Sequence, residues 1–397
     1  MKVGIWIPKD YHPEQGGSFS YINTLISRID QYKFDKSLDI CFITTKVVHW
    51  GFSKELVCVG PFEKIQLVHN FLSSFKGLKL IDKVYFKYFK SRIHKKLKYA
   101  NIDIVYYLKQ GECVIPSFPF ILTNWDIGHR SSYAFPELCD LGEFQRRELF
   151  YREIVPRAIK IIVESEAGKK ELMDYTNIGT HRIDVVRLFP GAVCDIKISN
   201  DEIEERIKNL GLESLNFFYY PAQYWSHKNH VIILKALLEL KDSFPDIVIV
   251  FCGSDKGNLT HVKRKIKEFG LSDNVKVFNF LPNLDVRALY ERCISVVFPS
   301  FIGPTNMPII ESMLFGVPII CSDFKGHREI LGDAGIYFDP SDPIELSQCM
   351  RLVVREHVRY KSKVKLQAQN SLFKAECSIV SLNDILLKTK IVRDTWN

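Results

Sequence analysis

Residues 294–321 read ISVVFPSFIGPTNMPIIESMLFGVPIIC, and this stretch decides the fold. An apolar run at 294–298 predicts a strand, and a Gly/Pro/Thr/Asn loop leads from it into a helix with Pro308 near its start. A second apolar run at 318–321 predicts the next strand. A strand, a helix and another strand in this order form a β-α-β crossover, which is the unit of a parallel sheet.

The same alternation extends along nearly the whole chain. Continuous Val/Ile/Phe runs are typical of strands that are buried on both faces of a parallel sheet. The sequence predicts strands at 3–7, 38–44, 102–108, 118–123, 159–163, 183–188, 217–220, 247–251, 275–280, 294–298, 318–321 and 335–338. With helices between them, these strands predict an α/β fold of two doubly wound halves.

A polar stretch at 198–210 separates the two sets of strands. We therefore expect an N-terminal Rossmann-like domain at 1–198 and a C-terminal Rossmann-like domain at 199–377. We also expect a C-terminal helix at 378–397 that can cross back to the N-terminal domain. Ligands of doubly wound sheets bind beyond the carboxyl ends of the strands, so two facing sheets place the ligand in the cleft between the domains.

Composition narrows the classes of protein. The 397 residues are 46% hydrophobic and 25% charged, with a net charge of +8, which excludes a disordered chain and a small disulfide scaffold. Ten scattered cysteines include no C-x-x-C pair, and several lie in apolar runs, so we expect reduced thiols and a cytoplasmic location. No window approaches 18 uncharged apolar residues, so any membrane contact is expected to be peripheral.

Several common catalytic motifs are absent from the sequence. There is no G-x-G-x-x-G, which argues against a dinucleotide oxidoreductase, and there is no P-loop, G-x-S-x-G or H-E-x-x-H. No D-x-D occurs, so a pair of carboxylates that binds a divalent metal is not visible. We therefore expect neither a metal site nor a bound cofactor.

Three motifs lie where predicted strands end. Gly16 and Gly17 follow the first strand, where paired glycines let backbone N–H groups approach a phosphate, or simply form a tight turn. Lys228 lies in the stretch YYPAQYWSHKNH at 219–230 and can neutralise a phosphate, or can be a solvated lysine. His129 follows a strand of the first half, where it either faces the cleft or is a structural histidine.

A fourth motif is the loop that ends the strand at 294–298. Its geometry aims the free N–H groups at the start of a helix toward an anion. Glu311 lies about one turn into this helix and can accept hydrogen bonds from ribose hydroxyls. A glutamate on a helix usually faces solvent, but the apolar neighbours here predict a largely buried helix.

Taken together and in this order, these motifs resemble the retaining GT-B glycosyltransferases, most closely glycosyltransferase family 4. The resemblance covers nearly the whole chain and is strongest over 215–345. It implies the GT-B fold, in which two Rossmann-like domains face each other across a cleft. It also implies a nucleoside-diphosphate sugar as the donor, of the GDP or UDP type.

The resemblance implies roles for the residues that contact the donor diphosphate. Backbone groups at a Gly-Gly loop contact it in the family, and Gly16 and Gly17 match. The lysine of an Arg-x4-Lys motif stabilises the leaving diphosphate, and Lys228 matches. Backbone amides of the loop before the helix contact sugar and phosphate. The matching residues are Thr305, Asn306 and Met307.

Two further roles concern the sugar and the ribose. The second glutamate of a Glu-x7-Glu motif binds the nucleotide ribose in the family, and Glu311 matches. A histidine of the N-terminal domain contacts the donor sugar, and His129 is the candidate. The chain departs from the family pattern at Gln223, which replaces the motif arginine, and at Gly303, which replaces the first glutamate.

The resemblance implies a retaining, metal-independent sugar transfer to a glycan or lipid-linked glycan acceptor in bacterial surface polysaccharide synthesis. The leaving diphosphate develops negative charge, so preorganised donors such as Lys228 are expected to supply the largest catalytic effect. The alternatives are a catalytically inactive nucleotide-sugar binding protein, a GT-B epimerase, and a phosphorylase that carries pyridoxal phosphate.

A basic segment lies in the first half. Nine Lys/Arg residues and one acid fall between Lys76 and Lys98, and aromatic and aliphatic residues recur at roughly helical spacing over 75–98. A basic helix with an aromatic face fits an anionic membrane surface. The alternative is a solvated helix whose apolar face packs in the core. No nucleic-acid-binding module accompanies the segment, so we expect no nucleic acid partner.

Overall fold

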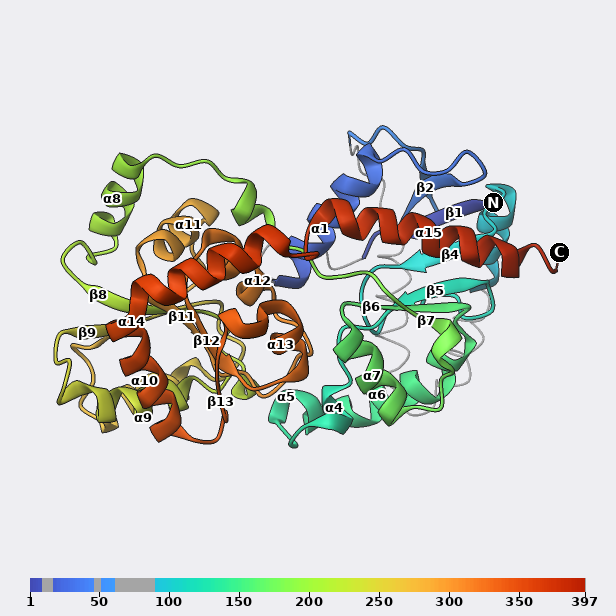
Figure 1. Ribbon diagram of the computed structural model, residues 1–397. Helices are drawn as coiled ribbons and strands as arrows, with labels where there is room; N and C mark the ends of the chain where they lie inside the picture. Colours follow the sequence, from blue (N-terminus) through green and yellow to red (C-terminus); the bar gives the residue numbers. More distant parts are fainter. Residues whose placement is uncertain (9–16, 46–50, 61–89, 397) are drawn as a thin grey trace.

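The computed structural model describes residues 1–8, 17–45, 51–60 and 90–396, which form two α/β halves side by side (Figure 1). In the N-terminal half, a parallel sheet has the strand order β3-β2-β1-β4-β5-β6-β7. Its strands are β1 (Lys2–Trp6), β2 (Asp39–Thr44), β3 (Leu56–Cys58), β4 (Ile104–Tyr107), β5 (Phe120–Thr123), β6 (Lys160–Val163) and β7 (Ile183–Val185). Its labelled α-helices are α1 (Gly17–Gln31), α4 (Gly128–Ser131), α5 (Pro136–Cys139), α6 (Glu143–Glu153) and α7 (Glu166–Tyr175).

The C-terminal half repeats this design with the strand order β10-β9-β8-β11-β12-β13. Its strands are β8 (Asn216–Pro221), β9 (Ile247–Cys252), β10 (Val275–Phe278), β11 (Ser295–Phe298), β12 (Ile319–Ser322) and β13 (Ile336–Phe338). Its α-helices are α8 (Asn200–Asn209), α9 (His230–Lys241), α10 (Leu259–Glu268), α11 (Asn283–Arg292), α12 (Met307–Phe315), α13 (Lys325–Leu331) and α14 (Pro343–Asn370), and α15 (Ala375–Arg393) ends the chain.

All the strand pairs in both sheets are parallel, as the apolar runs predict. In each sheet the strand order reverses beside the first strand, between β1 and β4 and between β8 and β11. Such a reversal opens a crevice at the carboxyl ends of the strands, where doubly wound folds bind their ligands. The fold therefore places one ligand-binding edge in each half.

Every strand expected from the sequence is present, and the prediction of two doubly wound α/β units is confirmed. One strand was missed. β3 has only three residues and lies at the edge of its sheet, with partly buried side chains at Leu56 and Val57, so its apolar run is short. β7 ends at Val185, short of the predicted 188.

The chain passes from the N-terminal to the C-terminal half before α8. A capping box defines the start of this helix: the Ser199 hydroxyl accepts from the backbone N–H of Glu202, whose carboxylate accepts from the Ser199 N–H at 2.9 Å. Ile203 and Ile207 then pack in the same core cluster as Phe217 of β8.

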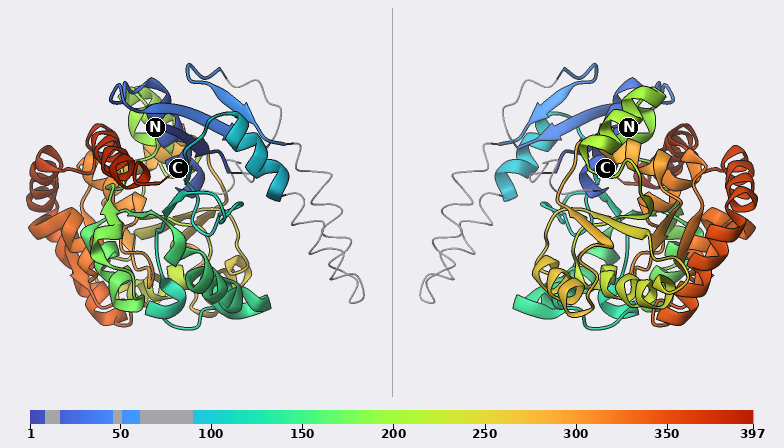
Figure 2. Two further views of the ribbon diagram at one scale, coloured as in Figure 1. Left: turned by 90° about the vertical axis from the view of Figure 1, so that its right-hand side faces the viewer. Right: turned by 90° about the vertical axis from the view of Figure 1, so that its left-hand side faces the viewer.

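The chain returns after α14. In Figure 1, α14 lies along the C-terminal half and α15 lies along the N-terminal half, beside α1. Among the bonds that hold α15 there, the Asp35 N–H donates to Asn383 Oδ1 at 3.0 Å, and Ser378 Oγ donates to the Arg187 carbonyl at 2.7 Å. α15 begins at Ala375, ahead of the predicted 378. Figure 2 shows that both termini lie on the N-terminal half.

The basic segment is described only from residue 90 onward; its residues 75–89 lie outside the described part. Residues 90–99 are helical, and Ile93 and Leu97 are buried in the core beneath β-strands of the N-terminal half. Lys96 Nζ donates to the carbonyls of Val59 and Gly60 at 3.3 and 3.1 Å. In the part of the chain that the structure covers, none of the helices has the length and apolarity needed to span a bilayer.

We predict that Leu382→Ala destabilises the protein by about 2–5 kcal/mol, because Leu382 of α15 is fully buried and truncation leaves a cavity. Thermal or denaturant unfolding measures the change. Val380→Ala is the control in the same helix, since Val380 is 49% exposed and its truncation should cost about 0.5 kcal/mol or less. Equal effects of the two variants would contradict the packing of α15 described above.

Candidate functional site

A cavity of about 670 Å³ lies between the two halves, at the carboxyl ends of both sheets. From the N-terminal half it is lined by α1, by the segment after β5 and by the end of β6. From the C-terminal half it is lined by the loops after β8 and β11 and by the start of α12. Both crevices that the strand orders predict therefore open into one cavity.

Lys228 ends a short 3-10 helix, Ser226–Lys228, that follows β8. Its Nζ donates to Asn306 Oδ1 at 3.0 Å and to Ser300 Oγ at 3.3 Å, and it lies 5.0 Å from the centre of the Phe298 ring. Burial lowers the pKa of Lys228 to about 8. Because these partners are neutral, they do not compensate the positive charge of the ammonium group. The charge is therefore available to an anionic ligand, as an anion-binding site requires.

The residue after Lys228 fixes the course of the chain. Asn229 has φ of 56°, a left-handed conformation that asparagine tolerates better than most residues. Its Nδ2 donates to the carbonyls of Pro299 and Pro340 at 3.3 and 2.7 Å. The Lys-Asn pair thus joins the loop after β8 to the loop after β11.

The loop after β11 leads directly into α12. Asn306 caps this helix in an extended conformation without a side-chain cap bond, and Pro308 stands in the first turn. Thr305, Asn306 and Met307 line the cavity, so the start of α12 faces it. Uncapped N–H groups at a helix start attract anions. Gly303 has φ of 107°, where a side chain would be strained, so this wall of the cavity carries no side chain at that position.

A buried histidine orients Asn306 from behind. His327 Nδ1 lies 2.7 Å from the Ser322 carbonyl, which can only accept, so Nδ1 carries the proton. Nε2 is then the acceptor for Asn306 Nδ2, at 3.1 Å. Burial lowers the pKa of His327 to about 4, so the ring stays neutral at pH 7. The amide oxygen of Asn306 is therefore the atom that faces Lys228.

Glu311 is buried at the inner side of α12 and lines the cavity. Its Oε1 accepts from the Gly191 N–H at 3.3 Å, and its Oε2 accepts from the Tyr290 hydroxyl at 2.8 Å. Burial raises its pKa. Each carboxylate oxygen retains a second lone pair for a ligand hydroxyl. The structure thus places Glu311 in the same cavity as Lys228.

Of the two glycines that were predicted to contact the diphosphate, only one lies in the described part of the chain. Gly16 lies outside the described residues, and Gly17 is the first residue of α1. Phe19, Ser20 and Asn23 of α1 line the cavity. Gln223 of the second half also lines it, where its Oε1 accepts from Trp225 Nε1 at 3.2 Å.

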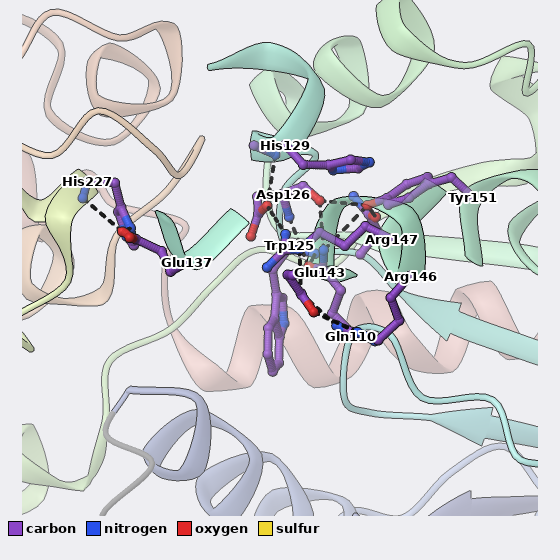
Figure 3. Close-up of polar contacts among 12 residues, drawn as sticks. Gln110, Trp125, Asp126, His129, Glu137, Glu143, Arg146, Arg147, Tyr151 and His227 are labelled. Atoms are coloured by element: carbon purple, nitrogen blue, oxygen red, sulfur yellow. Dashed lines mark hydrogen bonds and ion pairs between the residues drawn. The ribbon is translucent and has the colours of Figure 1, made fainter. Parts of the chain in front are cut away.

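His129 does not line the cavity, and the expectation that it faces the cleft is wrong. It lies in the short helix α4 with its imidazole directed toward Tyr151 (Figure 3), at a ring separation of 5.1 Å. Its Nε2 lies 3.0 Å from Glu148 Oε1, and burial lowers its pKa. The physical reason is that the chain turns into α4 directly after the loop that follows β5, which rotates His129 away from the cavity.

Trp125 and Asp126 take the place that was predicted for His129. Gln110 Oε1 accepts from their backbone N–H groups at 2.6 and 3.0 Å, and Asp126 Oδ1 accepts from the Gly128 N–H at 2.9 Å (Figure 3). Both residues line the cavity. They lie four and three residues before His129, so sequence reasoning found the segment but chose the wrong side chain.

A second set of residues that the sequence did not single out joins the two halves. Glu137 Oε1 of α5 accepts from His227 through the backbone N–H at 2.9 Å and contacts its Nδ1 at 2.5 Å (Figure 3). Burial opposes ionisation of Glu137, but these hydrogen bonds prevail and lower its pKa to about 2. Because His227 precedes Lys228, this contact also holds the loop that carries the lysine.

Another bridge is made by Glu329 of α13. Its two carboxylate oxygens accept from the backbone N–H groups of Glu166 and Ala167 at 3.1 and 3.0 Å, at the start of α7. A carboxylate at a helix N-terminus is stabilising. Among the described residues, no group of three His, Cys, Asp or Glu side chains is arranged to hold a metal ion.

We predict that Gly326→Ala disrupts the loop that carries Thr305 and Asn306. A Cβ at position 326 would lie 1.3 Å from the carbonyl oxygen of Pro304, so the backbone must shift. Overpacking of this kind costs about 1–3 kcal/mol, which unfolding experiments measure. Gly51→Ala is the control, because a Cβ there meets nothing within 4 Å. An unchanged melting temperature for Gly326→Ala would refute the close approach.

Comparison with known proteins shows which proteins this chain is similar to. Residues 201–370 match the family described as Glycosyl transferases group 1. The O-antigen chain mannosyltransferase B of Escherichia coli is 37% identical over 235 residues, covering 55% of this chain and 60% of that protein. The D-inositol 3-phosphate glycosyltransferase of Corynebacterium kroppenstedtii is 24% identical over 223 residues, covering 53% and 49%. The match thus spans about half to three-fifths of the length of these curated relatives.

Solved structures extend the likeness to the whole chain. The crystal structure of Anabaena Alr3699/HepE in complex with UDP and glucose superposes with a TM-score of 0.70 at 16% identity, covering 98% of this chain and 100% of that one. At this identity the likeness concerns the fold alone. The family match and this superposition confirm the resemblance inferred from the motifs: residues 201–370 are similar to the glycosyl transferases group 1, and the chain has the GT-B fold.

Proposed function

We propose that this protein is a glycosyltransferase that moves a sugar from a nucleoside-diphosphate donor to a glycan acceptor in bacterial surface polysaccharide synthesis. The observation that carries the proposal is Lys228, a cation held by neutral partners beside the uncapped start of α12 in the cavity between the halves. The names of the relatives support it, since an O-antigen chain mannosyltransferase and a D-inositol 3-phosphate glycosyltransferase each match a little over half of the chain.

The proposed donor lies across the C-terminal wall of the cavity. Glu311 accepts hydrogen bonds from the ribose hydroxyls, and Lys228 and the N–H groups at 305–307 bind the diphosphate. This arrangement stabilises the negative charge that the diphosphate gains as its bond to the sugar breaks, which is the step that needs most stabilisation. A charged lysine and a helix start supply the positive potential, so the proposed reaction needs no divalent metal.

The proposed reaction retains the configuration of the sugar. The acceptor oxygen attacks the anomeric carbon on the face that the diphosphate leaves, and the leaving phosphate oxygen takes the proton of the acceptor hydroxyl. The contacts of Glu137 and Glu329 join the two halves beside the cavity. In the proposed reaction, closure of the halves on the donor excludes water and limits its hydrolysis. We further propose that the basic segment at 75–98, of which the structure describes residues 90–98 as helical, brings the protein to an anionic membrane surface.

Binding of nucleoside diphosphates tests the proposal directly. A thermal-shift series with UDP, GDP, dTDP, ADP and CMP in EDTA should reveal one preferred diphosphate; at a hundred times its Kd it stabilises the folded protein by about 2.7 kcal/mol. The matching sugar nucleotide should then be consumed only with an acceptor, and NMR should show a retained anomeric configuration. Binding without turnover would favour an inactive binding protein, and conversion of the donor without an acceptor would favour an epimerase.

We predict that the affinity for the preferred nucleoside diphosphate falls about tenfold between pH 7 and pH 9. The anion binds the protonated lysine, and the pKa of Lys228 in the free protein is about 8, so affinity is retained below that pH and lost as pH rises through it. Isothermal titration calorimetry measures the profile.

Lys228→Met is the control for this pH dependence. The variant should bind the diphosphate weakly and without the wild-type fall in affinity, because it lacks the ammonium group. Any titration of the nucleobase affects both proteins equally. A wild-type profile as flat as that of the variant would show that Lys228 does not bind the phosphate in its charged form.

A further inference from the structure

Glu164 is a buried carboxyl group in the cavity that the proposed mechanism does not use. It follows the last residue of β6, and its residue is only 8% exposed, yet it lines the cavity. The next residue fixes its position: Ser165 caps α7 by accepting from the Gly168 N–H at 3.0 Å. The chain therefore cannot rotate at this point, and the side chain of Glu164 projects beyond the carboxyl end of the sheet.

The carboxyl group of Glu164 forms a hydrogen bond with the C-terminal half. Its Oε2 accepts from the hydroxyl of Thr305, in the loop that opens α12. Asn306, the neighbour of Thr305, holds Lys228. Glu164 thus lies beside the proposed diphosphate site, on the wall that the N-terminal half contributes. Glu311, the proposed ribose ligand, has different partners, Gly191 and Tyr290, so we assign Glu164 to the sugar end of the donor and not to the ribose end.

The chemistry of Glu164 fits a hydroxyl group better than a cation or a phosphate. Burial raises its pKa to about 8, and the nearby charge of Asp126 acts in the same direction, so the group is mostly neutral at pH 7. A neutral carboxyl group both donates and accepts hydrogen bonds. Gly303, which has no side chain, lines the same cavity on the wall of the C-terminal half.

We propose that Glu164 hydrogen-bonds a hydroxyl group of the transferred sugar and thereby contributes to the choice of sugar nucleotide. This inference rests on the proposed function, since it takes the ligand of the cavity to be a nucleoside-diphosphate sugar. It assigns the N-terminal half a direct contact with the donor. The bond to Thr305 forms across the two halves, so the contact is complete only when they are closed on each other.

The experiment compares each sugar nucleotide with its own diphosphate. The pair is GDP-mannose with GDP, or UDP-glucose with UDP, whichever contains the diphosphate that the wild-type protein binds. Calorimetry gives the Kd of each member, and the quantity compared is the Kd of the sugar nucleotide divided by the Kd of its diphosphate. Glu164→Ala should raise this ratio about tenfold, the effect of losing one to two hydrogen bonds, and leave the diphosphate Kd within about twofold. Unchanged diphosphate binding also shows that the variant is folded.

Two matched variants complete the design. Glu164→Gln keeps a neutral group that donates and accepts, so its ratio should stay within about threefold of the wild-type value. Glu171→Gln changes a partly buried carboxyl of the same half that hydrogen-bonds Ser131 and does not line the cavity, and it should change neither Kd. A ratio that Glu164→Ala leaves unchanged, or equal losses for both ligands, would overturn the inference.

Failure of this inference is distinct from failure of the proposed function. A wild-type protein that binds neither these four ligands nor any other nucleotide of the thermal-shift series rejects the proposed function, and the role of Glu164 falls with it. A wild-type protein that binds both members of a pair, with a ratio that Glu164→Ala does not move, rejects the role of Glu164 alone.

Discussion

A positive charge held by neutral partners between two sheets is the interaction on which the rest of the site depends. Lys228 faces the amide oxygen of Asn306, whose orientation is set by His327 and, through it, by the Ser322 carbonyl at the end of β12. In each of these hydrogen bonds, only one of the two groups can be the donor. The ammonium group is therefore preorganised before any ligand arrives, which is the condition for strong electrostatic stabilisation.

The two halves contribute different parts to the cavity. The C-terminal half supplies the cation, the helix start and Glu311, and the N-terminal half supplies Trp125, Asp126 and Glu164. Carboxylates join them: Glu137 to the loop that carries Lys228, and Glu329 to the start of α7. Because α15 returns to pack on the N-terminal half, the chain connects the halves at two places, which constrains how they move relative to each other.

The sequence predicted the fold and the C-terminal wall well, for a physical reason. Buried parallel strands need long apolar runs, and a helix start that faces a cavity needs Gly, Pro and Asn nearby, so both leave a visible pattern. The wall from the N-terminal half was predicted less well. His129 faces away because a local turn rotates it, and Glu137 acts through a contact with a residue distant in sequence, which leaves no local signal.

A structure of the protein with the nucleoside diphosphate that it prefers tests the central claim most directly. The account predicts that a diphosphate oxygen lies within hydrogen-bond distance, about 2.7–3.2 Å, of Lys228 Nζ and that another faces the N–H groups at 305–307, with the ribose at Glu311. A nucleotide bound outside the cavity between the halves, or bound there with Lys228 directed away from the phosphates, would contradict it.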